Sequence, residues 1–311
     1  MIKINLFGFD NHIIDTSKFD HLLHGKVVTD FEKQVCKYVG AKYAASFHSA
    51  SYAMYCVMKS KACNVSDTIR IPSMIPPVVP NVLRDAGKNI LLYDDIDWVG
   101  DSYVLTENVI DSAQKINRNQ YKKECGDDDI MIFSLYPTKP LSSLDGGVIV
   151  SNNKDKIDDL KSLAFYGMDY SDDSWSRKQK QVGFKAYMST MQATIASRNI
   201  SKLDNKYSII DSIRYEYNNA FGLDNTSRHL YRIKVKDNVH AIDYFKSLGI
   251  VCGVHYTPIH LNDVYSDLQS DHLSAVETAA KQTLSIPMHH RMKTSDVFYV
   301  IGCVKKYEGL L

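Results

Sequence analysis

Short runs of apolar residues alternate with amphipathic stretches along the first half of the chain. Apolar runs bounded by polar turns are typical of buried strands, whereas apolar positions spaced three or four apart are typical of helices. Strands are therefore predicted at residues 43–47, 68–71, 90–93, 108–111, 130–135 and 147–151. Helices are predicted at residues 30–39, with Asp30 as N-cap, and at residues 51–59 and 79–86. This alternation predicts an α/β domain whose mainly parallel sheet is covered by helices on both faces.

The second half of the chain begins with helical patterns and ends with a second α/β pattern. One long helix is predicted at residues 189–217. Beyond it, strands are predicted at residues 230–235 and 250–255, and helices at residues 239–248 and 295–307. We therefore expect a large domain over residues 1–208 and a small C-terminal α/β domain over residues 209–311.

Composition and charge exclude several classes of protein. The 311 residues include 37 basic and 36 acidic side chains, so no charge excess favours nucleic acid or an anionic membrane surface. No apolar run approaches the roughly 18 residues of a membrane span, and the first residues turn polar too early for a signal peptide. Six scattered cysteines without CxxC spacing indicate reduced thiols of a cytoplasmic protein, with neither disulfides nor a metal site expected.

One lysine stands out in the segment 130–150, IMIFSLYPTKPLSSLDGGVIV. Lys139 follows a predicted strand, and the flanking Pro137 and Pro140 restrict its backbone. A lysine held at a strand end suits Schiff-base chemistry, which needs an amine of lowered pKa that attacks a carbonyl. The alternative is a surface lysine beside a turn.

Two more segments carry groups that suit a charged ligand. Asp111 ends an apolar strand, where a carboxylate faces the ligand crevice of an α/β sheet and can pair with a protonated ring nitrogen. Alternatively, it caps a helix. Residues 48–53, HSASYA, join a strand to a helix through small residues. The N–H groups of such a helix start bind phosphate, helped here by the hydroxyls of Ser49 and Ser51, although small residues at such a turn also serve packing alone.

These segments follow one another as phosphate-type turn, carboxylate and loop lysine. In this order the chain resembles the DegT/DnrJ/EryC1/StrS family of pyridoxal-phosphate-dependent sugar aminotransferases. Residues 30–53 are similar to that family's helix, strand and phosphate turn, with Ser49-Ala50-Ser51 in place of the usual Ser-Gly-Thr. VIDSAQ is similar to its Glu-Asp-Ala-Ala-Gln stretch, and FSLYPTKPLSSLDGG to its Ser-Phe-x-x-x-Lys…Gly-Glu-Gly-Gly stretch. VGFKAYMSTMQATIA, GVHYTPIH and TLSIPMHHRMKTSDVFYVI fit its later signatures.

The resemblance implies a pyridoxal-phosphate (PLP)-dependent transferase of fold type I. It implies transamination from an amino acid, glutamate in our expectation, to a keto group of a nucleotide-linked deoxysugar, with pyridoxamine phosphate as the intermediate form of the cofactor. Lys139 would form the Schiff base with PLP and move the proton during amino transfer. Asp111 would keep the ring nitrogen protonated, and Gln114 would approach the phenolic oxygen.

The resemblance also assigns residues to the rest of the cofactor. The expected phosphate ligands are Ser49, Ala50, Ser51 and Ser134. Pro76 would cover one face of the ring, where the family commonly has an aromatic residue. Ala50 replaces a glycine and would crowd the turn if this position required a positive φ angle.

Three further residues are expected near the substrate or the neighbouring subunit. Lys185 stands where the family often has an asparagine that reaches the phosphate of the neighbouring subunit's cofactor. This implies a homodimer with shared active sites. Tyr187 replaces the usual arginine, and His255 lies in a stretch near the substrate mouth, although a histidine in such a strand is also commonly structural.

The largest departure from the family lies between Asp97 and Asp111, which are separated by thirteen residues. The family has a helix-containing crossover there, and a parallel crossover needs about a dozen residues or more by itself. We therefore predict that one β–α unit is lost and that the sheet is reduced.

Two alternatives to an aminotransferase remain. A pyridoxamine-dependent sugar dehydratase of the same family has a histidine at the position of Lys139, so the lysine argues against it. A non-catalytic or regulatory relative would keep the fold as a binding or dimerisation module. The missing unit and Pro76 favour that alternative, whereas the presence of Lys139 and Asp111 opposes it.

Overall fold

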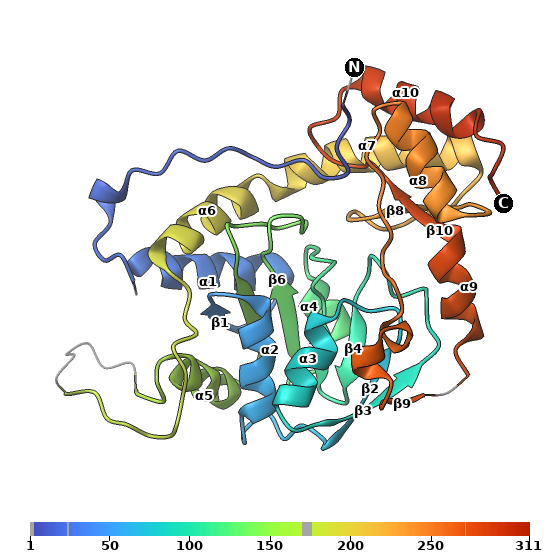
Figure 1. The fold of residues 1–311 in the computed structure, drawn as a ribbon. Coiled ribbons are helices and arrows are strands. Elements are labelled where there is room, and N and C mark those ends of the chain that lie inside the picture. The colour runs from blue at the N-terminus through green and yellow to red at the C-terminus, as the bar shows by residue number, and fades with distance from the viewer. Residues whose placement is uncertain (1–2, 24, 170–175, 271) are drawn as a thin grey trace.

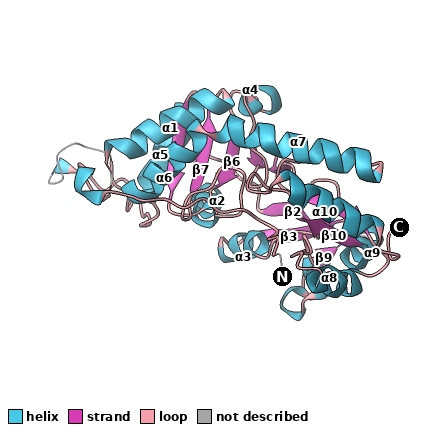
Figure 2. Ribbon diagram, turned by 90° about the horizontal axis from the view of Figure 1, so that it is seen from above, coloured by secondary structure: helices cyan, strands magenta, loops and turns pink. Residues whose placement is uncertain are grey.

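A computed structural model describes residues 3–23, 25–169, 176–270 and 272–311 of the chain. Two groups of helices each pack around their own strands, and the long helices α6 and α7 connect them along the top of the molecule (Figure 1, Figure 2). Within the described residues, no helix combines the length and apolarity needed to cross a membrane.

The larger group is built on a five-stranded sheet in the order β1-β7-β6-β5-β4. Its strands are β1 (Tyr43–Phe47), β4 (Tyr103–Thr106), β5 (Val109–Asp111), β6 (Ile130–Ser134) and β7 (Gly147–Ser151). Only the β5–β6 pair is parallel in this sheet, while β1–β7, β6–β7 and β4–β5 are antiparallel. The α/β class is as expected, but the sheet is mixed rather than mainly parallel. The β4–β5 and β6–β7 pairs are each joined by a connection without a helix, and such connections favour antiparallel pairing.

The strands of this sheet send alternate side chains to two apolar clusters. On β6, Met131 and Phe133 join one cluster, while Ile130 and Ile132 join the other. The first cluster includes residues of α1 (Lys26–Val39) and α6 (Thr190–Ser201), and the second includes residues of α2 (Ala50–Lys59) and α5 (Lys154–Ala164). Helices therefore cover both faces, as expected.

The predicted start of the first helix is wrong by about one turn. α1 begins at Lys26 after Gly25 as N-cap, so Asp30 lies inside the helix. The earlier start is favoured by packing, because Val27 and Val28 lie against the first apolar cluster. The short helix α4 (Gln120–Glu124) lies between β5 and β6.

A separate three-stranded parallel sheet has the order β2-β3-β9. Its elements are β2 (Thr68–Pro72), β3 (Asn89–Tyr93) and β9 (Gln269–Ser270), and α3 (Val78–Asp85) connects the first two. The chain then passes through turns to β4 and β5, and the fully described segment between Asp97 and Asp111 contains no helix. This confirms the predicted absence of a helical crossover.

The smaller group surrounds an antiparallel pair of strands, β8 (Tyr231–Lys234) and β10 (Thr283–Ile286). Its helices are α8 (Asn238–Ser247), α9 (Ser274–Gln282) and α10 (Thr294–Lys305), with short 3₁₀ turns η3 (Ile259–Leu261) and η4 (Asp263–Tyr265). The predicted strand at residues 250–255 is wrong. Only single bridges form there, from Ile250 to Ile4 and from Gly253 to Ser285, because the segment lies between two different partners.

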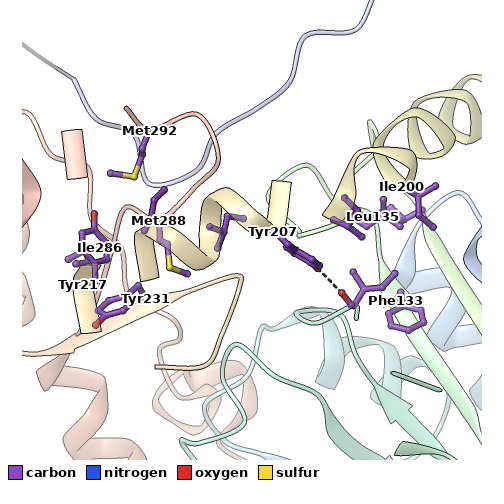
Figure 3. Packing of buried hydrophobic residues seen from close by; sticks show 14 of the residues in the cluster. Phe133, Leu135, Ile200, Tyr207, Tyr217, Tyr231, Ile286, Met288 and Met292 are labelled. Carbon is purple, nitrogen blue, oxygen red and sulfur yellow. Dashed lines mark hydrogen bonds between the residues drawn. The ribbon is translucent and has the colours of Figure 1, made fainter. Parts of the chain in front are cut away.

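The helix predicted at residues 189–217 is divided at Lys202 into α6 and α7 (Leu203–Phe221). Figure 3 shows that α7 carries Tyr207 near the end of β6 and Tyr217 near β8 and β10. The hydroxyl of Tyr207 donates to the carbonyl of Ile116 at 2.7 Å, and that of Tyr217 donates to the carbonyl of Pro287 at 2.9 Å. One helix therefore ties both groups together.

Residues 3–23 form an extended N-terminal strap that includes the 3₁₀ turn η1 (Thr16–Lys18). It runs from the neighbourhood of α10 across the molecule toward α1 (Figure 1). The backbone N–H of Ile4 donates to Gly249 at 2.8 Å, and the N–H of Val251 donates back to Ile4 at 2.9 Å. The strap thus brings residues from the beginning of the chain against the smaller group.

Candidate active site

A cavity of about 650 Å³ lies at the ends of β5 and β6. Nine of the eleven predicted site residues line it: Ser49, Ala50, Ser51, Pro76, Asp111, Gln114, Ser134, Lys139 and His255. They come from segments up to two hundred residues apart, so the fold gathers the predicted motifs into one place. Lys185 and Tyr187 do not line this cavity.

Asp111 is held at the end of β5 with 5% of its surface exposed. Its Oδ1 accepts the backbone N–H of Ala113 at 2.9 Å, and its Oδ2 accepts the hydroxyl of Tyr103, also at 2.9 Å. Burial raises the pKa of this carboxyl, whereas the two hydrogen bonds and the positive charge of Lys139 oppose that rise. The carboxylate is therefore oriented from two sides.

Lys139 lies in the loop that connects β6 to β7, and its backbone N–H donates to the carbonyl of Tyr136 at 2.9 Å. Burial lowers the pKa of the Lys139 amine to about 8, and the attraction of the Asp111 carboxylate partly offsets this effect. About one-tenth of the amine is therefore unprotonated at pH 7. An unprotonated lysine is the form that attacks a carbonyl carbon.

The helix end of the cavity consists of Ser49, Ala50, Ser51 and Ser134. Ser49 is the N-cap of α2, and its hydroxyl accepts the N–H of Tyr52 at 3.3 Å. The first residues of a helix have N–H groups without intrahelical acceptors, and these attract anions. Ala50 is not among the non-glycine residues with positive φ in the described part of the chain, so the crowding considered for this position does not arise.

Gly147 fixes the helix end of the cavity by close packing. In the sheet it pairs with Phe47 of β1 and with Ser134 of β6, which brings Ser134 beside the start of α2. A Cβ atom at position 147 would lie 2.5 Å from Cα of Ala50 and 2.7 Å from its nitrogen. Only glycine allows this approach, which explains the Asp-Gly-Gly sequence before β7.

Gln114 and Pro76 form two other walls. Gln114 is 2% exposed, and its Oε1 accepts the backbone N–H of Gly100 at 2.9 Å. Pro76 lies in the loop between β2 and α3. Their predicted contacts with a cofactor ring remain predictions.

The two predicted residues outside the cavity have different surroundings. Lys185 is exposed and forms a single backbone bridge with Phe165. Tyr187 is buried, and its hydroxyl lies 3.2 Å from that of Tyr166. Neither side chain reaches Lys139 within the cavity, so their predicted roles remain to be tested.

Sequence reasoning missed most of the other end of the cavity. We call this the aromatic end, and it consists of Phe7, Trp98, His229, His255 and Tyr256. Only His255 was predicted. The remaining four come from the strap, from the segment before β4, from the residues before β8 and from the residue after His255. Tyr256 lies in the GVHYTPIH stretch, whereas no motif marks Phe7, Trp98 or His229.

Ring contacts and burial order the aromatic end. The ring of Phe7 stacks on His229 with centroids 5.7 Å apart and meets His255 edge-on at 5.9 Å. The Nδ1 atom of His255 lies 2.9 Å from the hydroxyl oxygen of Ser285. Burial lowers the pKa of His255 to about 4 and that of His229 well below its usual value, and the charge of Lys139 adds to both shifts. Both imidazoles are therefore neutral at physiological pH.

Three complementary groups thus face one space. Lys139 offers an amine for a carbonyl, Asp111 offers a carboxylate for a cationic nitrogen, and the helix end offers N–H groups for a phosphate. The aromatic end provides apolar faces and neutral imidazoles for a larger polar ligand. The set suits group transfer on a carbonyl compound that carries a phosphate.

The sequence matches a known protein family over most of its length. The profile of the DegT/DnrJ/EryC1/StrS aminotransferase family matches residues 9–97 and 108–305. The match is interrupted at residues 98–107, inside the segment that lacks a crossover. The UDP-4-amino-4,6-dideoxy-N-acetyl-beta-L-altrosamine transaminase of Campylobacter jejuni strain 81-176 is 25% identical, over 91% of this chain and 90% of that protein.

Solved structures show the same fold. A putative sugar aminotransferase of Streptococcus pneumoniae in its apo form superposes with a TM-score of 0.82 at 16% identity, over 97% of each chain. Helicobacter pylori PseC, an aminotransferase involved in the biosynthesis of pseudoaminic acid, superposes with a TM-score of 0.78 at 18% identity, over 96% of this chain and 98% of that one. These likenesses confirm the expected fold of the PLP-dependent transferases of fold type I.

Proposed function

The chain belongs to the DegT/DnrJ/EryC1/StrS aminotransferase family, and on this premise we propose that it is a PLP-dependent sugar aminotransferase. It transfers an amino group, which we propose comes from glutamate, to a keto group of a nucleotide-linked deoxysugar. The Campylobacter jejuni relative, whose name describes a transaminase acting on a UDP-linked dideoxy amino sugar, supports this class of substrate. Bound PLP would supply the carbonyl group that carries the amino group from donor to acceptor.

The observation that carries the proposal is the convergence of Lys139, Asp111 and the start of α2 on one cavity. PLP has an aldehyde, a basic ring nitrogen and a phosphate, and each finds a matching group there. The close packing of Gly147 against Ala50 fixes the position of the helix start, which lines the cavity. The residues present therefore fit this cofactor.

Bound PLP supplies an aldehyde that joins to amines and a ring that withdraws electrons from the adjacent carbon. Lys139 holds the cofactor through its Nζ atom and then takes up and returns the proton that moves during amino transfer. Asp111 keeps a proton on the ring nitrogen, because a buried carboxylate stabilises the neighbouring positive charge. Ser49, Ala50, Ser51 and Ser134 would hold the phosphate, and Pro76 and Gln114 would contact the ring from the other walls of the cavity.

The aromatic end would receive the sugar. Its neutral His229 and His255 can donate or accept hydrogen bonds without placing a further positive charge beside Lys139. His255 is accordingly a proposed substrate contact, and Tyr187 is kept as a second proposed substrate residue although it does not line this cavity.

We further propose a homodimer with shared active sites. The exposed position of Lys185 outside its own cavity supports this, because its ammonium can then reach the phosphate of the neighbouring subunit's cofactor. We also propose the division into residues 1–208 and 209–311, and a cytoplasmic location, which the six free cysteines support.

The test is the visible absorption spectrum of the purified protein before and after addition of PLP, with Lys139→Ala alongside. We expect a PLP-dependent band that glutamate bleaches, and that borohydride reduction attaches to Lys139, as identified by mass spectrometry of the peptide. Absence of binding with excess PLP would contradict the proposal and favour the non-catalytic binding module. A band that glutamate leaves unchanged, but another amino acid bleaches, would correct the amino donor alone.

A further inference from the structure

Residues 98–107, at which the family match is interrupted, do more than connect two motifs. They include Trp98, which lines the cavity, and Tyr103, the first residue of β4. Both aromatic side chains are buried, with 7% of their surface exposed. The segment that takes the place of the lost unit therefore contributes directly to the surroundings of the site.

Tyr103 reaches the residue proposed to bind the ring nitrogen. β4 and β5 are antiparallel, and their register pairs Tyr103 directly with Asp111. The hydroxyl of Tyr103 donates to Oδ2 of Asp111 at 2.9 Å. The phenol stays protonated, because burial and the nearby carboxylate raise the pKa of Tyr103 well above its usual value. It is therefore always a donor and Asp111 always the acceptor.

Neighbouring rings restrict the position of this donor. The indole of Trp98 meets the Tyr103 ring edge-on, with centroids 4.8 Å apart. The same indole also lies nearly parallel to the ring of Tyr256, with centroids 6.3 Å apart. Because Tyr256 lines the cavity, the three rings form a continuous wall from β4 to the cavity. The hydroxyl of Tyr103 is thus held in place by packing as well as by its hydrogen bond.

We propose that Tyr103 is a positioning residue for the aminotransferase reaction, which fixes the Asp111 carboxylate through its hydroxyl and is supplied by the short segment that replaces the missing unit. This inference rests on the proposed function. A carboxylate that accepts two hydrogen bonds, from Tyr103 and from the N–H of Ala113, cannot rotate away from the cavity without losing one of them.

The hydrogen bond from Tyr103 also favours the charged form of Asp111 against the effect of burial. The other ionisable groups around Asp111 are Lys139, whose charge also favours the carboxylate, and Tyr256. When Tyr103 loses its hydroxyl, the pKa of Asp111 rises further. A larger fraction of Asp111 is then protonated as the pH falls, and a neutral carboxyl pairs poorly with a cationic ring.

The experiment measures the dissociation constant of PLP for the apo forms of the full chain at pH 8 and pH 6. Tyr103→Phe removes only the hydroxyl. Tyr217→Phe is the matched control, because Tyr217 is fully buried and its hydroxyl also has a single acceptor, the carbonyl of Pro287. Both changes are repeated in an Asp111→Asn background, and thermal unfolding of each apo form reports on folding.

For Tyr103→Phe we expect the dissociation constant to rise by about tenfold at pH 8, as for a lost hydrogen bond to a charged group. The increase should be larger at pH 6. Tyr217→Phe should keep the affinity for PLP within about twofold even if the protein becomes less stable. The hydroxyl of Tyr217 donates to Pro287 and not to Asp111. In the Asp111→Asn background the effect of Tyr103→Phe should shrink to within about twofold, since interacting residues are not additive.

Two results would overturn the inference while leaving the proposed function intact. One is an unchanged dissociation constant and pH dependence in Tyr103→Phe. The other is an equally large effect of Tyr103→Phe with and without Asp111→Asn, which would mean that the hydroxyl acts elsewhere. Failure of the wild-type chain to bind PLP would instead overturn the proposed function and this inference with it.

Discussion

The two ends of the cavity are built in different ways. The helix end comes from short sequence motifs at the ends of neighbouring strands, and backbone geometry determines it through the contact of Gly147 with Ala50. The aromatic end comes from side chains of the strap, the segment before β4 and the smaller group of elements. Backbone atoms in close contact form the helix end, so even one added methyl group would displace it. Side chains form the aromatic end, so substitutions there can change which ligand it binds. We infer that the helix end binds the cofactor and that the aromatic end selects the substrate.

Loss of Lys139, which lines the same cavity as both ends, tests whether they serve one reaction. In Lys139→Ala we expect turnover to fall by about a thousandfold or more, because both the covalent attachment and the proton transfer are lost. The apo protein should unfold at an equal or higher temperature, since removing a buried amine relieves desolvation. Lys139→Arg keeps the positive charge beside Asp111 and should be equally inactive. Wild-type turnover in either variant would assign the reaction to another residue.

Gly147→Ala tests the rigidity of the helix end. The new methyl group would lie 2.5 Å from Cα of Ala50, and overpacking of this kind costs about 1–3 kcal/mol. The displaced start of α2 should then raise the dissociation constant of PLP by about tenfold to a hundredfold, measured by titration of the apo protein.

Gly302→Ala is the matched control for this change. Apart from the adjacent backbone of its own helix, α10, no atom of the described residues lies within 4 Å of a Cβ built at position 302. We therefore expect unchanged PLP affinity and equal or higher stability. If Gly147→Ala bound PLP as tightly as this control, the turn would be more adaptable than its packing indicates.

The same contrast explains what could be predicted from the sequence. Lys139, Asp111 and the start of α2 could be marked as candidates because each is a local pattern at a strand end, and their order along the chain, through the family resemblance, gave them their expected roles. Phe7 and His229 could not be marked, because their contact depends on the path of the strap, which no local periodicity encodes. The false strand at residues 250–255 has a similar cause, since its backbone partners, Ile4 and Ser285, are chosen by tertiary packing.

The pH dependence of PLP capture tests whether burial lowers the pKa of the Lys139 amine. With a pKa of about 8 for Lys139, the unprotonated fraction falls from about nine-tenths at pH 9 to about one-tenth at pH 7. The rate of covalent capture by apo protein, followed by stopped-flow absorbance, should therefore fall about tenfold over this range and level off above pH 9. An exposed lysine would instead give a rate still rising steeply at pH 9.

Asp111→Asn tests the direction in which the carboxylate shifts the pKa of Lys139. The carboxylate raises the pKa of Lys139 against the effect of burial, so its removal should shift the midpoint of the capture rate below pH 8. A midpoint that moved upward, or stayed in place, would show that the two groups do not interact in solution as their positions indicate.

The smallest expected effect belongs to the aromatic end. Phe7→Ala removes the ring that stacks on His229 and meets His255, and aromatic pairs of this kind contribute about 0.5–1.5 kcal/mol. We expect KM for the nucleotide sugar to rise by about twofold to tenfold while the dissociation constant of PLP stays unchanged, because the helix end is intact. Phe9→Ala, two residues along the same strap and 52% exposed, should leave both quantities unchanged. If Phe7→Ala weakened PLP binding as much as Gly147→Ala does, the inference that the helix end binds the cofactor and the aromatic end selects the substrate would be wrong.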